Sequence, residues 1–201
     1  MWGGSTSRLT GGHIFPVRRY VLHPQYDDWT LDFDVAIMEV ERMLEGFPNL
    51  RPIALPASCA AACCGVCEPT PIRVAGWGAI ESGRLPINLL QVSKTVVNTA
   101  ACSAAWREPI SSRMFCTLVE NGKDSCQGDS GGAITNMERN VQVGVVSFGS
   151  EVCGGNLLTF FLILLNLIKH KFKFSDGSAP AVYARIENPQ IRDWIRQVAE
   201  V

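Results

Sequence analysis

The sequence predicts an all-β protein that ends in an α-helix, and two observations lead to this prediction. First, the extended segments are short: residues 133–135 and 141–148 have the pattern of two strands joined by a turn. Second, Asn188 is placed to cap a C-terminal helix that carries Pro189 in its first turn. The apolar residues of that helix fall on one face, namely Ile191, Trp194, Ile195 and Val198.

The bulk composition is that of an ordinary folded chain. It has 201 residues, of which 47% are apolar and 18% are charged, and a net charge of −1. This length can form one or two compact cores. The near-neutral charge gives no indication of a nucleic-acid partner, so we expect none. We expect no cofactor either.

The first 60 residues are predicted to form short strands and turns. Ile14, Val17 and residues 20–22 are candidates for extended structure. Pro24 then breaks the run, because proline lacks the N–H that a strand ladder needs. Asp34 precedes an apolar segment, residues 35–40, which we predict to be a buried strand. Taken alone, Asp34 is an acid at the end of a turn.

The stretch with the clearest chemistry is residues 124–132, Asp-Ser-Cys-Gln-Gly-Asp-Ser-Gly-Gly. Ser130 lies among glycines, which allow a tight turn and a close approach of the backbone to a substrate. A serine hydroxyl becomes a nucleophile when a base takes its proton and backbone N–H groups face the developing oxyanion. A glycine-rich turn without chemistry is the simpler alternative. The nucleophile elbow of α/β-hydrolases is disfavoured, because it needs a helix after the serine.

Residues 124–132 closely resemble the nucleophile loop of the trypsin-like, chymotrypsin-fold serine proteases. The resemblance implies that Ser130 is the nucleophile, and that the N–H groups of Gly128 and Ser130 form the oxyanion hole. It also implies that Asp124 is the floor of a pocket for lysine or arginine side chains. Asp129 resembles the acid that pairs with the freed N-terminus of a mature enzyme.

The same resemblance implies an architecture of two antiparallel β-barrels of the six-stranded type, the first of them incomplete, with a C-terminal α-helix. Residues 1–70 would form the incomplete N-terminal barrel and the link between the barrels. Residues 71–201 would form the C-terminal barrel and the helix. Residues 72–78, which end in Gly-Trp-Gly, are similar to the strand and corner that open the second barrel.

Further site residues are carried over from the family. Residues 34–37 resemble its aspartate motif, in which Asp34 orients a histidine and stabilises its charged form. Ser147, Phe148 and Gly149 resemble the edge that binds a substrate backbone as an added strand. Ala181 resembles the far wall of the pocket, where its methyl group narrows the slot. The implied disulfides are Cys102 with Cys116 and Cys126 with Cys153.

The sequence does not supply the histidine that this arrangement needs. The family places it upstream of the aspartate in an Ala-Ala-His-Cys context, whereas His13, His23 and His170 all have other contexts. A mature start of the Ile-Val-Gly-Gly type is absent too. We therefore expect the chain as written to be inactive, and an N-terminal piece to be missing from it.

Eight cysteines indicate an oxidising compartment. We expect an extracellular, secreted protein, although no signal peptide is visible at the N-terminus. Four cysteines share one loop, at positions 59, 63, 64 and 67. Local disulfides are favoured there over zinc, whose structural ligands usually come as two well-separated pairs. The pairing of these four stays open.

Residues 155–175 form an apolar insert that interrupts the resemblance. The segment is too short for a membrane span, which needs about 20 apolar residues, so membrane attachment is not expected. Its clean flanks and its Phe-, Leu- and Lys-rich composition motivate the hypothesis that it is translated intron sequence. A transcript that encodes residues 157–173 would end that hypothesis. A surface helix that binds a membrane or a partner is the alternative.

These observations favour a serine endopeptidase of the trypsin type that cleaves after Lys or Arg through an acyl-enzyme. Its partners would be polypeptide substrates or protein inhibitors, and we expect a monomer. The alternative is a non-catalytic protease homologue that binds or regulates a partner through the same cleft, which the missing histidine favours. A membrane-attached or cysteine-rich binding module is a third hypothesis, and it rests on the insert and the cysteine loop alone.

Overall fold

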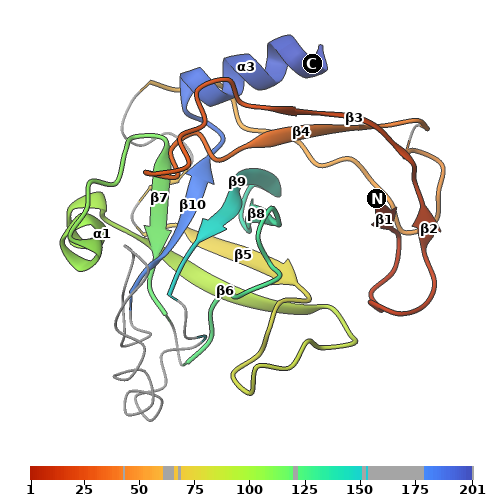
Figure 1. The fold of residues 1–201 in the computed structure, drawn as a ribbon, viewed down its shortest axis with the longest axis horizontal. Coiled ribbons are helices and arrows are strands. Elements are labelled where there is room, and N and C mark those ends of the chain that lie inside the picture. Colours follow the sequence, from red (N-terminus) through yellow and green to blue (C-terminus); the bar gives the residue numbers. More distant parts are fainter. Residues whose placement is uncertain are drawn as a thin grey trace.

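A closed, six-stranded antiparallel barrel is the centre of the molecule (Figure 1). The computed structural model describes residues 1–42, 44–60, 66–67, 69–119, 122–150, 153 and 179–200. Around the barrel the strands run in the order β10-β7-β6-β5-β8-β9. Their bounds are β5 Pro71–Gly76, β6 Leu90–Val97, β7 Met114–Thr117, β8 Ala133–Asn136, β9 Val141–Phe148 and β10 Ala181–Arg185.

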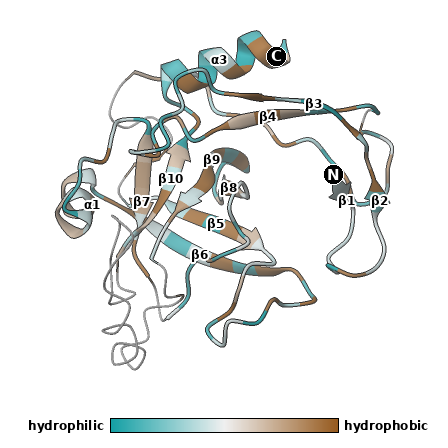
Figure 2. Cartoon of the chain, in the orientation of Figure 1, coloured by the Kyte–Doolittle hydropathy of each residue, from teal (hydrophilic) through white to brown (hydrophobic). Residues whose placement is uncertain are grey.

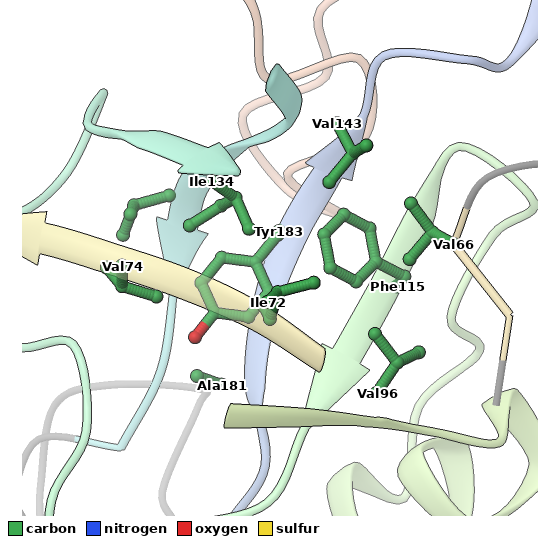
Figure 3. Close-up of a cluster of buried hydrophobic side chains, with 10 residues drawn as sticks. Val66, Ile72, Val74, Val96, Phe115, Ile134, Val143, Ala181 and Tyr183 are labelled. Atoms are coloured by element: carbon green, nitrogen blue, oxygen red, sulfur yellow. The ribbon is translucent and has the colours of Figure 1, made fainter. Parts of the chain in front are cut away.

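The barrel closes around an apolar core that alternate residues of its strands supply. In β5, Ile72 and Val74 are buried while Arg73 between them is exposed. This alternation is the period-two pattern of a strand with one face on a core. Figure 3 shows these side chains packed around the rings of Phe115 and Tyr183. The complete cluster is Val66, Ile72, Val74, Val96, Phe115, Ile134, Val143, Val146, Ala181 and Tyr183.

The described strands before residue 70 form two separate two-stranded sheets. The first pairs β1 (Trp2–Gly3) with β2 (His13–Ile14), and the second pairs β3 (Val17–Leu22) with β4 (Ala36–Val40). In Figure 1 the β3–β4 pair extends from the top of the barrel toward β1 and β2.

The prediction of a buried strand after Asp34 was correct about the strand but wrong about its burial. Among the described strands, β4 pairs with β3 alone, and Met38 remains 55% exposed. An apolar run in a sequence does not reveal whether a second layer covers it, and this one is partly open to solvent.

Two described helices pack on the barrel. The C-terminal helix α3 (Pro189–Ala199) begins as predicted: the Asn188 side chain accepts a hydrogen bond from the N–H of Gln190, and proline occupies the first turn. Its mixed hydropathy is visible in Figure 2, and its apolar face lies toward the barrel through buried Ile191. Helix α1 (Thr99–Trp106) was not predicted; Asn98 caps it by accepting from the N–H of Ala101.

Candidate active site

The loop that carries Ser130 is held against the end of β9 by backbone hydrogen bonds. The N–H of Gly131 donates to the carbonyl of Val146 (2.9 Å), and the N–H of Val146 donates to the carbonyl of Gly132 (2.9 Å). Gly128 and Gly131 have φ of +97° and +79°, a backbone conformation that glycine adopts without strain. Ser130 is thereby exposed at the tip of a rigid turn.

The loop around Ser130 has two backbone N–H groups that are not used in its own hydrogen bonding. Within the described residues, the N–H groups of Gly128 and Ser130 donate to no protein acceptor. The Asp129 carboxylate holds the turn from behind, since it accepts from the N–H groups of Gly78 (2.7 Å) and Cys126 (2.9 Å). Two fixed, unsatisfied N–H donors beside a hydroxyl are suited to bind an oxyanion.

Asp34 reaches the same end of β9 from the N-terminal part of the chain. Its Oδ2 accepts a hydrogen bond from Oγ of Ser147 (2.6 Å), which follows Val146 directly in sequence. The neighbours Phe33 and Val35 are buried in a cluster with Ile191 of α3 and Ala184 of β10. Packing on both sides of Asp34 thus fixes its backbone, and hydrogen bonds through residues 146 and 147 connect it to the Ser130 loop.

A cluster of charge-assisted hydrogen bonds anchors the segment before Asp34. The Arg113 guanidinium donates from Nε to both carboxylate oxygens of Asp32 (2.9 and 3.0 Å), and Ser111 Oγ donates to the same carboxylate (2.9 Å). Arg113 also donates to the side chain of Gln190 in α3 (3.0 Å). Burial raises the pKa of Asp32, but these bonds outweigh it, and the net effect is a lowered pKa.

The two described histidines have packing roles. His13 lies against the rings of Phe47 and Phe15 in the N-terminal sheet. His23 is 4% exposed and stacks on Phe33 at 4.5 Å, and burial lowers its pKa, so that the ring is neutral near pH 7. In the part of the chain that the structure describes, neither ring contacts Asp34 or Ser130. His170 lies outside the described residues.

The predicted walls of the site come together beside β9. Phe148 pairs in register with Val182 of β10 and meets Trp106 of α1 edge-to-face, with ring centroids 5.1 Å apart. Gly149 and Ala181 face each other, since a Cβ built on Gly149 would lie 3.8 Å from the Ala181 methyl. Ala181 is fully buried.

Two disulfides brace these walls. Cys102 of α1 is bonded to Cys116 of β7, and Cys126 of the Ser130 loop is bonded to Cys153, the same pairs that the resemblance implies. Cys59 and Cys67 are disulfide-bonded too, whereas residues 63 and 64 lie outside the described residues, as does the insert at 155–175.

Asp124 lies against a buried lysine that was not among the predicted site residues. Its Oδ1 accepts hydrogen bonds from the Lys94 ammonium and from the N–H of Ser125 (2.7 Å). Both side chains are nearly inaccessible, with exposed fractions of 0% for Lys94 and 9% for Asp124. Burial raises the pKa of Asp124, and the adjacent Lys94 ammonium opposes that rise.

Lys94 was missed at the sequence level, although β6 contains a signal for it. Val92, Lys94 and Val96 are alternate residues of the strand and turn to its inner side. A lysine in an inward position is rarely buried without a partner. Figure 2 shows hydrophilic positions among the hydrophobic ones along β6.

A cavity of about 510 Å³ lies beside Asp124. Its lining includes Asp124, Ser125 and Asp129 together with apolar atoms of Val74 and Leu90. Ser130, the segment 147–149 and Ala181 do not contribute to it. The cavity therefore adjoins Asp129 and the back of the nucleophile loop, and of the residues expected to bind substrate it touches Asp124 but not Ser147, Phe148, Gly149 or Ala181.

The described part of the chain holds no helix that is long and apolar enough to cross a membrane. It also contains no group of three or more His, Cys, Asp or Glu side chains placed to bind a metal ion.

Comparison with known proteins gives matches along nearly the whole chain. The sequence profile of the Trypsin family matches residues 1–171. "Trypsin 5G1" of Aedes aegypti is 30% identical over 200 residues, which are 98% of this chain and 64% of that protein. "Serine protease 1" of Rattus norvegicus is 37% identical over 135 residues, 65% of this chain and 51% of that protein. "Suppressor of tumorigenicity 14 protein homolog" of Bos taurus is 32% identical over 187 residues, 90% of this chain but 18% of that protein.

Proposed function

Because this chain belongs to the trypsin family of serine proteases, we propose that its site is that of a secreted endopeptidase that cleaves after Lys or Arg. One observation carries the proposal: hydrogen bonds through Ser147 and Val146 connect Asp34 with the Ser130 loop at the end of β9. These two residues are the acid and the nucleophile of a serine protease triad by resemblance.

In this proposal Ser130 Oγ attacks the carbonyl carbon of the scissile peptide bond. A base takes the hydroxyl proton and passes it to the leaving amine as the C–N bond breaks and the acyl-enzyme forms, and water then hydrolyses the ester to release the acid and restore the serine hydroxyl. The N–H groups of Gly128 and Ser130, which donate to no acceptor among the described residues, stabilise the oxyanion. The segment 147–149 binds the substrate backbone, and Ala181 and Asp124 bound the pocket for its basic side chain.

We further propose that Asp129 has the role of binding a freed N-terminal ammonium group. Its carboxylate borders the cavity of about 510 Å³, whose apolar lining suits an aliphatic N-terminal residue. The two disulfides between described cysteines support a secreted protein. Its partners would be polypeptide substrates or protein inhibitors, and we propose that it acts as a monomer.

A second candidate function is a binding protein without catalysis, and the positions of His13 and His23 favour it. Loss of the base from a serine protease triad costs about a millionfold in rate, or roughly 8 kcal/mol of barrier. We therefore propose that this polypeptide, by itself, gives no burst of acyl-enzyme with an arginine ester.

Chemical rescue tests the site in the chain as it exists. Imidazole in solution can take the place of an absent base, so it should accelerate hydrolysis of an arginine ester by the wild-type chain. The Ser130→Ala variant should show no such acceleration. Equal imidazole effects in the two proteins would contradict a nucleophilic Ser130. A burst without imidazole, abolished by Ser130→Ala, would show instead that the chain already contains its base.

A further inference from the structure

The ammonium group of Lys94 lies inside the barrel, directly against the residue expected to select the substrate. Strand β6 turns Lys94 inward between Val92 and Val96, so that the side chain runs through apolar surroundings and ends at Asp124. The Lys94 side chain has no exposed surface. A cation buried in this way costs several kcal/mol unless an anion compensates it.

The two oxygens of Asp124 have different surroundings. Oδ1 accepts from the Lys94 ammonium and from the N–H of Ser125, with Ser125 Oγ at 3.4 Å. Among the described residues, no donor is recorded for Oδ2. The hydroxyl of Tyr183 closes this network from β10 at 3.2 Å from Ser125 Oγ. A ligand could therefore reach Asp124 through Oδ2 while Lys94 remains bound to Oδ1.

The charge at this floor is already compensated before any ligand arrives. A carboxylate and an ammonium in contact have a net charge of zero, and a second cation at Oδ2 would be repelled by the first. In a site shielded from water such repulsion is screened only weakly. An unpaired carboxylate at the same place would attract a basic side chain with its full charge.

We propose that Lys94 is a specificity-determining residue that weakens the preference of this pocket for Lys and Arg side chains. The ammonium acts as an internal counter-ion of Asp124, so the pocket still takes Lys and Arg side chains but discriminates only weakly against uncharged side chains of similar shape. This inference rests on the proposed function in one respect: Asp124 must face the substrate pocket.

Binding of two small probes tests the inference without any chemistry at Ser130. Benzamidine is a planar cation at pH 8, and benzamide is a neutral molecule of nearly the same shape. We expect the wild-type chain to bind benzamidine less than about tenfold more tightly than benzamide in calorimetric titrations. A charge-assisted hydrogen bond is worth roughly tenfold to a hundredfold in affinity. A preference for benzamidine above about a hundredfold would overturn the inference.

The Lys94→Met variant keeps the length of the side chain and removes its charge. It should bind benzamidine about tenfold more tightly than the wild type, with unchanged affinity for benzamide. Lys123→Met is the matched control, because Lys123 is an exposed lysine next to Asp124 in sequence. An equal gain in both variants would overturn the inference, since it would show a general effect of net charge.

Stability of the variants does not limit the test. The ratio of the benzamidine and benzamide affinities is measured on the wild-type chain and so needs no variant. The double variant Lys94→Met/Asp124→Asn removes both buried charges together, and it should not show the tighter benzamidine binding expected of Lys94→Met alone. Failure of either probe to bind any of these proteins would also overturn the inference. The test is distinct from that of the proposed function, because a chain without acyl-enzyme chemistry can still bind both probes.

Discussion

The Arg113–Asp32 pair should contribute far more stability than a surface ion pair, because it joins three parts of the molecule. Arg113 precedes β7, Asp32 belongs to the segment before β4, and Gln190 of α3 completes the cluster. The guanidinium also lies over the ring of Phe33, 4.4 Å from its centroid. Arg113→Met retains most of the aliphatic stem and removes these hydrogen bonds.

The expected cost follows from burial and geometry. The Arg113 and Asp32 side chains are 22% and 15% exposed, so solvent screens their interaction only in part. Loss of a forked, charge-assisted interaction leaves a mostly buried carboxylate with weaker partners, and costs about 2–3 kcal/mol in the free energy of unfolding. Arg18→Met is the control: Arg18 binds Glu39 at 3.0 Å but is 70% exposed, so its loss should cost at most about 0.5 kcal/mol.

Urea unfolding followed by tryptophan fluorescence measures both costs. The double variant Arg113→Met/Asp32→Asn should be less destabilised than the sum of its single variants, by about 1–2 kcal/mol, because the second change removes the uncompensated carboxylate. Equal effects of Arg113→Met and Arg18→Met would refute the reasoning that burial makes the Arg113 pair strong.

Three further predictions follow from described contacts. Since Asp32 has a lowered pKa in the folded chain, its contribution is present above its usual value of about 3.9 and is lost as pH falls further; urea midpoints measured from pH 5 to pH 2 should fall less steeply in Asp32→Asn. Gly144→Ala would place a Cβ 2.6 Å from the Phe115 ring, so it should destabilise the fold by about 1–3 kcal/mol and lower the melting temperature. An unchanged melting temperature would show that the ring moves freely. Trp106→Phe removes the buried hydrogen bond from the indole to the carbonyl of Pro180 (2.9 Å) and should cost about 1–3 kcal/mol in urea unfolding; a cost near zero would mean that water replaces the indole.

Helices and strands that are stabilised by residues close to them in the sequence could be predicted from local sequence signals. The cap at Asn188 and the apolar face of α3 could be predicted because a helix satisfies its own backbone within a few residues. Strands β8 and β9 were predictable for a similar reason, as a turn connects them directly. Helix α1 has an equally local cap at Asn98, but no helix was predicted there.

The candidate site depends on contacts that no local pattern contains. Asp34 and Ser147 are 113 positions apart, and their hydrogen bond exists only because the Phe33 cluster docks the N-terminal segment on β10 and α3. Lys94 meets Asp124 because the register of β6 turns it inward, and that register is set by pairing with β5 and β7. Resemblance supplied candidate roles for Asp34 and Asp124, but it could not supply the lysine beside Asp124.

The position of β10 in the barrel has a consequence for how the protein is made. This strand comes last in the sequence but lies between β7 and β9, so both of those strands have an unpaired edge until residues 181–185 are in place. During synthesis the barrel stays open until β10 has been made and can pair with β7 and β9. Exposed edges invite pairing with other molecules, so nascent chains are at risk of aggregation over that interval, and a chaperone that shields strand edges would raise the yield.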